Sequence, residues 1–384
     1  MIPGSGSADR LDETRGGRTE IRVSERVTVI GAGITGLTVG LLAARAGLRT
    51  EVVDPQLRPG QRTGLMGAPA GLQQELQYHH VLRWHGAGGL QAYADQVRRG
   101  QRFVLAAAAD AGVPVRFADQ ATLTADGKEA FWLRHEVHAM RRAGVPAEFT
   151  DETGLPFSAR PMLVTGDQPV LDPAAYRDGL LETFTEAGGV VEDRPRGGAG
   201  GWLVSTTPEP AFDRVLLGPR LRSSEWSWLE LTSEDPGAFP GRSGTDLDDG
   251  GRLWIRTAED RLLLGSRRDD GRARAASWFP DARVTDAWRA RATASLDAAP
   301  FVGFAGRAAE RRLVACGFDA WELTLGTAAA LQLAAVLTGG GTGRAELPWA
   351  PIRVPRPLSL LGAGWSRARH GLKISPVSPF PRRR

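Results

Sequence analysis

Three closely spaced glycines, Gly31, Gly33 and Gly36, are the residues whose types and spacing point most directly to chemistry. They lie in VIGAGITGL, residues 29–37, between β-branched residues and an apolar segment. In such a turn the first glycine permits a tight bend, the second lets the backbone approach a pyrophosphate, and the third lets the helix pack closely. The free N–H groups of the helix terminus would then face the phosphates, so the stretch predicts a dinucleotide site.

The elements that must position this turn are a strand, a helix and a second strand. RVTVI (26–30) is expected as a buried strand, Ile34 to Gly47 as a helix, and TEVVD (50–54) as the next strand. They form a right-handed βαβ unit. Asp54 then lies where a carboxylate accepts hydrogen bonds from ribose hydroxyls. The alternative is that the glycines serve tight packing alone, and the turn itself does not distinguish NAD from FAD.

Composition bounds the class of protein. The chain has 384 residues, 42% of them apolar and 24% charged, which is typical of a globular protein with one or two domains. Its single cysteine, Cys316, excludes an internal disulfide and a cysteine-rich zinc site. Residues 1–23 are polar and glycine-rich, and they are expected as a disordered leader. No apolar stretch approaches the ~20 residues of a membrane span, so the protein is expected in the cytoplasm. Residues 346–384 are expected as a basic extension that is solvated; nucleic acid or an anionic membrane is the alternative partner.

Several further elements are expected along the chain. The region 218–266 alternates like β-structure, with a hairpin around Ala258–Asp260. Strands are expected over 202–208 and 312–317. Helices are expected over 89–112, 127–145, 173–187, 285–296 and 327–340. The resulting fold class is α/β, a Rossmann-like domain interleaved with an α+β domain.

The C-terminal half resembles a known family. LDAAPFVGF (296–304) and GFDAWELTLGTAAALQLAAVLTG (317–339) resemble the flavin-contacting segment of the D-amino-acid oxidase and glycine oxidase superfamily. TGLMGAPAGLQQELQYHHVL and WLVSTTPEP stand where that family has matching segments. The subgroup that resembles the chain is often fused to a Rieske domain, whose Cys/His pattern is missing from this sequence.

The resemblance implies FAD as cofactor and an amine or amino acid as substrate, oxidised by hydride transfer at the C–N bond. It implies an FAD domain from residues 24–80, 170–210 and 296–345, and a substrate domain from 81–169 and 211–295. The helix near Thr327 would direct its N-terminus at the flavin. The implied cofactor-binding residues are Gly31, Gly33, Ile34, Thr35, Gly36, Asp54, Thr63, Thr206, Gly317 and Thr324.

Three residues are candidates for the reaction. Arg256 would hold a substrate carboxylate, unless it is an ordinary surface arginine. Thr324 stands where sarcosine-oxidase-like relatives place an oxygen-activating lysine, which favours a dehydrogenase over an oxidase. Glu322 stands where the family tends to have glycine, so it either recognises an amine or obstructs the flavin. Tyr78 matches a tyrosine of the subgroup, with a core tyrosine as the alternative.

Departures from the family leave a second hypothesis open. Leu65 to Ala68 replace small hydroxyl residues near the cofactor, and residues between Val191 and Trp202 are too few for the family's β-meander. A degenerate member that serves as a scaffold is therefore the alternative, and an NAD-dependent dehydrogenase ranks behind both. No metal site is expected, since His135 and His138 do not form an H-E-x-x-H motif. His79, His80 and His85 are expected at a domain junction and Cys316 in the core. Neither a membrane nor nucleic acid is expected as a partner, and the electron acceptor and oligomeric state stay open.

Overall fold

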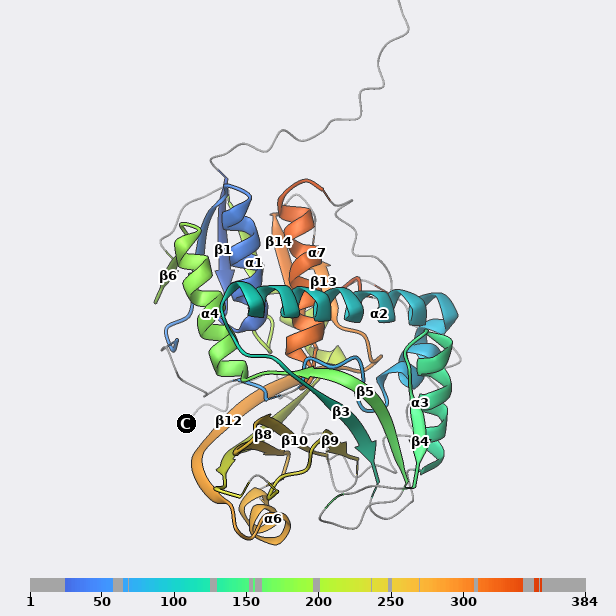
Figure 1. Ribbon diagram of the computed structural model, residues 1–384. Helices are drawn as coiled ribbons and strands as arrows, with labels where there is room; N and C mark the ends of the chain where they lie inside the picture. Colours follow the sequence, from blue (N-terminus) through green and yellow to red (C-terminus); the bar gives the residue numbers. More distant parts are fainter. Residues whose placement is uncertain are drawn as a thin grey trace, which may run out of the picture.

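The fold is built on two β-sheets, which Figure 1 shows one above the other, with the long helix α2 crossing at the level where they meet. The computed structural model describes residues 25–57, 65–67, 69–124, 130–151, 155, 161–195, 201–235, 237–247, 251–268, 270–306, 310–340, 349–351 and 353. The expected leader lies outside these residues. No helix within them is long and apolar enough to cross a membrane.

The first sheet has six strands in the order β13-β14-β7-β1-β2-β6. Its neighbours pair in parallel, except for the edge strand β13, which is antiparallel to β14. The strands are β1 (Arg26–Ile30), β2 (Arg49–Val53), β6 (Val190–Glu192), β7 (Trp202–Ser205), β13 (Phe301–Phe304) and β14 (Arg312–Cys316). The expected strands at 26–30, 50–54, 202–208 and 312–317 are confirmed.

Three helices lie along this sheet: α1 (Ile34–Arg45), α4 (Pro173–Glu186) and α7 (Thr327–Leu337), of which α1 packs against both of the others. Parallel sheets need such cover because both of their faces must be buried. Helix α1 connects β1 to β2, which confirms the βαβ unit, and Gly47 follows its end with a φ of +83°. A π-helical turn, η4 (Glu322–Gly326), leads directly into α7.

Helix α2 (Gln77–Asp110) begins well before the helix expected at 89–112, and Gly86 interrupts it with a φ of +73°. Its first turn is capped by a residue distant in sequence. The Glu136 carboxylate, on α3 (Ala130–Arg142), accepts the N–H groups of Tyr78 at 3.0 Å and His79 at 2.6 Å. The two oxygens of this buried carboxyl group satisfy N–H donors that have no partner within the helix, so α3 fixes where α2 begins.

The second sheet has eight strands in the order β12-β8-β11-β10-β9-β3-β5-β4, antiparallel except between β3 and β9. The expected hairpin is β10–β11. The strands are β3 (Arg116–Leu123), β4 (Glu148–Thr150), β5 (Met162–Val170), β8 (Leu221–Thr232), β9 (Ser243–Asp246), β10 (Arg252–Ala258), β11 (Arg261–Ser266) and β12 (Arg283–Ser295). The remaining short helices are α5 (Arg214–Leu217), a 3-10 turn (Gly218–Arg220) and α6 (Gly271–Trp278).

The helix expected over 285–296 is wrong, because this segment is strand β12. Alanine and arginine favour helices, which suggested the prediction. The burial pattern has the period of a strand instead: Trp288, Ala290 and Ala292 are buried, while Arg289 and Arg291 are exposed. Pairing along nearly the whole of β8 overrides the helix propensity.

Three stacked indoles form a wall on this sheet. The ring of Trp228 lies 5.8 Å from that of Trp226 and 6.0 Å from that of Trp288 on β12. The Trp288 indole donates to the Leu65 carbonyl at 3.0 Å, which fastens the segment after β2 to the wall. Stacked aromatic pairs add stability beyond the area that they bury.

Gly265 leaves room for this wall, so we expect Gly265→Ala to destabilise the protein. A Cβ there would lie 2.6 Å from the Trp228 ring. Overpacking of this kind costs about 1–3 kcal/mol of unfolding free energy, measurable by chemical denaturation. The matched control is Gly241→Ala, because a Cβ at Gly241 has no atom within 4 Å. Equal stability of the two variants would contradict this view of the wall.

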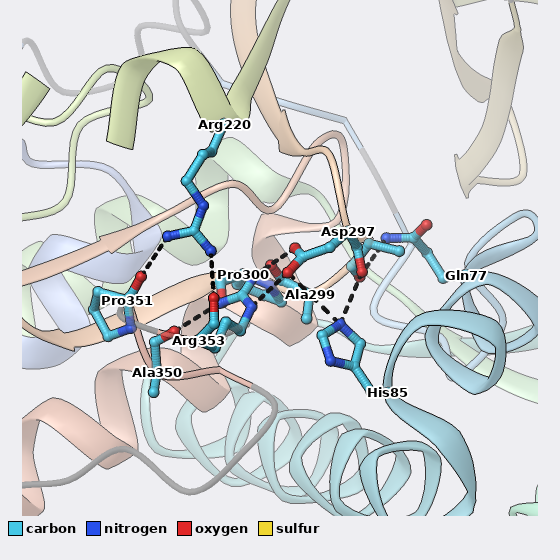
Figure 2. A network of polar contacts seen from close by, with 10 residues as sticks. Gln77, His85, Arg220, Asp297, Ala299, Pro300, Ala350, Pro351 and Arg353 are labelled. Carbon is cyan, nitrogen blue, oxygen red and sulfur yellow. Dashed lines mark hydrogen bonds and ion pairs between the residues drawn. The ribbon is translucent and has the colours of Figure 1, made fainter. Parts of the chain in front are cut away.

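The last described residues are anchored to the turn between β12 and β13 (Figure 2). Arg353 donates to the two carboxylate oxygens of Asp297 at 2.7 Å and 2.5 Å. Arg220 donates to the Pro351 carbonyl at 2.7 Å, and the His85 ring nitrogen lies 2.9 Å from the Asp297 carbonyl. Trp349 is fully buried. The described part of the expected extension is therefore part of the folded body.

Candidate cofactor and active site

The glycine turn at the end of β1 is held from three sides. Gly31 has a φ of +104°, which favours glycine, and its N–H donates to the Val53 carbonyl at 3.0 Å. A Cβ on Gly36 would lie 1.8 Å from the Gly31 carbonyl oxygen, so α1 can approach only because this residue lacks a side chain. The Thr206 hydroxyl donates to the carbonyls of Ile30 at 3.0 Å and Gly31 at 3.2 Å. Thr206, the residue directly after β7, thus fixes the carbonyl groups of the turn.

Asp54 lies beside this turn, at the end of β2. Its carboxylate accepts the N–H of Ala32 at 3.1 Å and the N–H of Gln56 at 2.9 Å. The acid and the glycine turn therefore share one location, as a dinucleotide site requires.

A cavity of about 250 Å³ opens over the turn and extends to the second sheet. Its lining comes from both halves of the fold. The lining residues are Gly31, Ala32, Gly33, Asp54, Gln56, Leu57, Leu65, Met66, Arg177, Thr206, Thr207, Pro208, Arg291, Ala292, Thr293, Cys316, Gly317, Phe318, Asp319 and Glu322. A ligand bound at the glycine turn could therefore extend through the cavity as far as β12.

Glu322 occupies the mouth of the glycine turn. One carboxylate oxygen accepts the Thr35 hydroxyl at 3.2 Å and the Thr35 N–H at 3.4 Å. A Cβ on Gly33 would lie 2.8 Å from the same oxygen. Burial raises the pKa of Glu322, although the two hydrogen bonds from Thr35 oppose this shift. A carboxylate therefore lies against the helix terminus that normally receives a phosphate.

The residues fit the dinucleotide part of FAD with this one exception. Gly31, Gly36 and Asp54 provide the turn, the close helix packing and the ribose acceptor. Gly33 offers a backbone without a side chain, but its open face is in contact with Glu322. Gly317, with a φ of +87°, lines the far side of the cavity. Ile34 is buried at the start of α1, and Thr63 lies outside the described residues.

Thr324 does not line the cavity. It is fully buried, and its hydroxyl accepts a hydrogen bond from the Gln74 amide at 2.8 Å. The Gln74 oxygen in turn accepts the Tyr93 hydroxyl in a short hydrogen bond. A Cβ on Gly100 of α2 would lie 2.1 Å from the Thr324 carbonyl oxygen. Through Thr324, η4 is thus packed against α2.

Arg256 also lies away from the cavity. Its guanidinium donates to the carbonyls of Glu259 at 2.9 Å, Phe239 at 3.3 Å and Ala258 at 3.4 Å. Arg256 is half-buried and its side chain holds carbonyls at and near the β10–β11 hairpin. It does not meet the cofactor residues.

Tyr78 and Cys316 are core residues. Tyr78 is fully buried and donates to the Leu72 carbonyl at 2.8 Å, and burial raises its pKa. Burial raises the pKa of the Cys316 thiol to about 12, so it stays protonated at neutral pH.

His79 is packed with its ring 5.3 Å from the ring of His135, and burial lowers the pKa of His79 to about 4. Among the described residues no cluster of three or more potential ligands could hold a metal ion.

Other charged residues near the cavity were not foreseen from the sequence. Arg177 on α4 is 3% exposed, lines the cavity and pairs with Asp178 at 2.7 Å. Asp319, also in the lining, accepts a hydrogen bond from Arg267 at 2.8 Å. That guanidinium lies 4.5 Å over the Trp226 ring. Only the positive φ of Asp319, +52°, marks it as unusual, and a φ is not visible in a sequence.

The comparison with protein families decides the classification. A family of FAD-dependent oxidoreductases, DAO, matches residues 26–336. The chain belongs to this family. No curated protein matches the chain by sequence. The family is FAD-dependent, so the two-sheet architecture is that of an FAD-binding fold, as the resemblance implied.

Solved structures of this DAO fold are similar over nearly their whole length. Glycine oxidase from Geobacillus kaustophilus has a TM-score of 0.67 at 16% identity, covering 86% of this chain and 99% of that one. L-proline dehydrogenase from P. horikoshii has a TM-score of 0.65 at 13% identity, covering 85% and 97%. Iminodiacetate oxidase from Chelativorans sp. BNC1 has a TM-score of 0.63 at 16% identity, covering 85% and 99%. At these identities the likeness concerns the fold alone.

Proposed function

We propose that the protein is an FAD-dependent oxidoreductase that oxidises the C–N bond of an amine or amino acid. The observation that carries the proposal is the cavity, which joins the glycine turn and Asp54 to the face of β12. A substrate held on the second sheet would thus lie next to a cofactor held on the first. The named enzymes of similar fold act on L-proline, glycine and iminodiacetate, which all carry nitrogen beside a carboxylate-bearing carbon.

The chain's own residues have separable roles in this proposal. Gly31 and Gly33 admit the pyrophosphate, and Asp54 accepts hydrogen bonds from the ribose. Leu65 and Met66, fastened to the tryptophan wall through Trp288, keep water from the reacting end. These residues would hold FAD, whose chemistry would be the acceptance of a hydride from the carbon beside nitrogen; the imine product would then be hydrolysed by water.

We infer a dehydrogenase rather than an oxidase. The described lining of the cavity contains no lysine, and both lysines of the sequence, Lys128 and Lys373, lie outside the described residues. Thr324, which stands where the resemblance implies the family's lysine, is fully buried within η4 against α2.

Anaerobic mixing with amines tests the proposal. The FAD-loaded protein is mixed with a panel of amino acids and amines while the flavin absorbance is followed. We expect bleaching by at least one of them, and slow recovery in air compared with an artificial acceptor. A loaded protein that no member of the panel bleaches would contradict the proposed reaction.

A scaffold function is the second candidate, because one observation favours it. The Glu322 carboxylate stands at the phosphate-binding terminus of α1. A protein that takes up no FAD would support this candidate over the enzyme.

A further inference from the structure

We propose that Glu322 is a built-in competitor for the FAD pyrophosphate, and that FAD binds with uptake of a proton or displacement of this side chain. The inference rests on the proposed use of FAD. It concerns a single side chain of η4 that reaches across to the first turn of α1.

The protein's own carboxylates satisfy the donors that a phosphate would use. Asp54 accepts the Ala32 N–H at 3.1 Å, and Glu322 accepts the Thr35 N–H at 3.4 Å. Helix N-termini bind anions because their first N–H groups lack partners within the helix. At α1 one of these N–H groups is directed at Glu322, so the side chain stands in for an anionic ligand.

The position of Glu322 is set by packing. Two glycines make room for it: a Cβ on Gly33 would lie 2.8 Å from its carboxylate oxygen, and a Cβ on Gly326 would lie 2.8 Å from its Cγ. The Thr35 hydroxyl adds a second hydrogen bond at 3.2 Å. The backbone face of Gly33 is the face that a pyrophosphate must approach. The carboxylate and the pyrophosphate therefore compete for one position.

The other charged residues of the cavity lining do not offset the repulsion between Glu322 and a bound pyrophosphate. The cavity lining contributes Asp54, Asp319, Arg177 and Arg291, two of each sign. Each arginine has an acidic partner, since Arg177 pairs with Asp178 at 2.7 Å and Arg291 with Glu209 at 3.2 Å.

The helices packed against η4 add no charge at this point. Helix α7 has no ionisable side chain, and α1 carries only Arg45, in its last turn. Helix α2 meets η4 through Gly100, while its neighbours Arg98, Arg99 and Arg102 line a separate surface hollow.

Protonation should relieve the repulsion. Burial raises the pKa of Glu322, so this side chain is neutralised at a higher pH than an ordinary glutamate. A bound pyrophosphate raises that pKa further, because it adds negative charge nearby. FAD affinity should therefore rise as pH falls, with a proton taken up on binding.

Titration calorimetry with FAD, and with ADP as a probe of the pyrophosphate site alone, tests this. The proteins are the wild type, Glu322→Gln and Glu322→Gly, each from acidic to mildly alkaline pH and in buffers of different ionisation enthalpy. The matched control is Glu234→Gln, which removes one exposed negative charge outside the cavity lining. We expect both Glu322 variants to bind at least about tenfold tighter near neutral pH, without proton uptake. The control should behave as the wild type.

Two outcomes would overturn the inference while leaving FAD use intact: wild-type binding that is independent of pH and equal to that of Glu322→Gln, or weaker binding by Glu322→Gly. The proton uptake of the wild type is a test that needs no variant. Failure of every protein to bind FAD or ADP would overturn the proposed use of FAD together with the inference.

Discussion

Gly33→Val is expected to abolish FAD retention while leaving the chain folded. Gly33 has a φ of −68°, which valine tolerates, and the nearest atom to a new Cβ is the flexible end of Glu322. The backbone is therefore not strained, yet the branched side chain fills the face that the pyrophosphate must approach. We expect affinity for FAD to fall by at least about 100-fold, or about 2.7 kcal/mol, in equilibrium dialysis.

The matched control is Gly88→Val on α2, where a Cβ has no atom within 4 Å. This variant carries the same added side chain and should retain FAD as the wild type does. Unchanged FAD content in Gly33→Val would contradict the assignment of the glycine turn. Loss of folded structure in Gly33→Val, seen by circular dichroism, would contradict the view that Gly33 serves the ligand rather than the fold.

Asp297→Asn is expected to cost about 3–5 kcal/mol of unfolding free energy, because it leaves a buried guanidinium without its counter-ion. The side chains of Arg353 and Asp297 are only 2% and 6% exposed. Breaking the pair also weakens the attachment of residues 349–351 and 353, which Arg353 and Arg220 hold (Figure 2). Urea denaturation of the variant and the wild type measures the difference.

The same pair gives stability a defined pH dependence. Burial alone would raise the pKa of Asp297, but the hydrogen bonds and charge of Arg353, helped by His85 and Arg220, lower it below its ordinary value. A carboxylate whose pKa is lowered in the folded state contributes stability above its unfolded pKa of about 4, and this stability is lost as pH falls through the folded-state pKa. The wild type should therefore lose stability in strong acid more steeply than Asp297→Asn.

The control for this pair is the exposed one between Arg283 and Glu234, whose side chains are 76% and 92% exposed. Glu234→Gln should change the unfolding free energy by no more than about 0.5 kcal/mol. A loss in Asp297→Asn as small as in this control would contradict the role assigned to the buried pair.

Local patterns in the sequence were enough to predict the nucleotide half of the fold. The β-branched run, the glycines and Asp54 lie within one βαβ unit, where periodicity and turn chemistry suffice. The strand at 312–316 and helix α7 followed from apolar runs bounded by glycines. The family resemblance added FAD, which the family match confirms.

What failed depended on contacts between distant residues. Strand β12 resembles a helix in composition, and only its pairing with β8 makes it a strand. The start of α2 is set by Glu136 from another helix. Arg256 was placed on a strand correctly, but a sequence does not show that its side chain turns to the hairpin carbonyls.

The contact between Glu322 and Thr35 was equally hidden, since it joins residues 287 positions apart. The sequence singled out Glu322 as a departure from the family, with amine recognition or obstruction as the alternatives. Its position over Gly33 depends on the packing of η4 against α1, which no local pattern in the sequence shows. Contacts between side chains so far apart in the chain produce no periodic pattern in the sequence.

The visible absorption spectrum of the purified protein, recorded after incubation with FAD and removal of free cofactor, tests the central claim most directly. We predict a retained flavin spectrum at a stoichiometry near one FAD per chain, with more FAD retained at lower pH. A bound ligand that prefers the folded state should also raise the melting temperature. A colourless protein that retains no FAD at any pH, and whose melting temperature FAD leaves unchanged, would contradict the account.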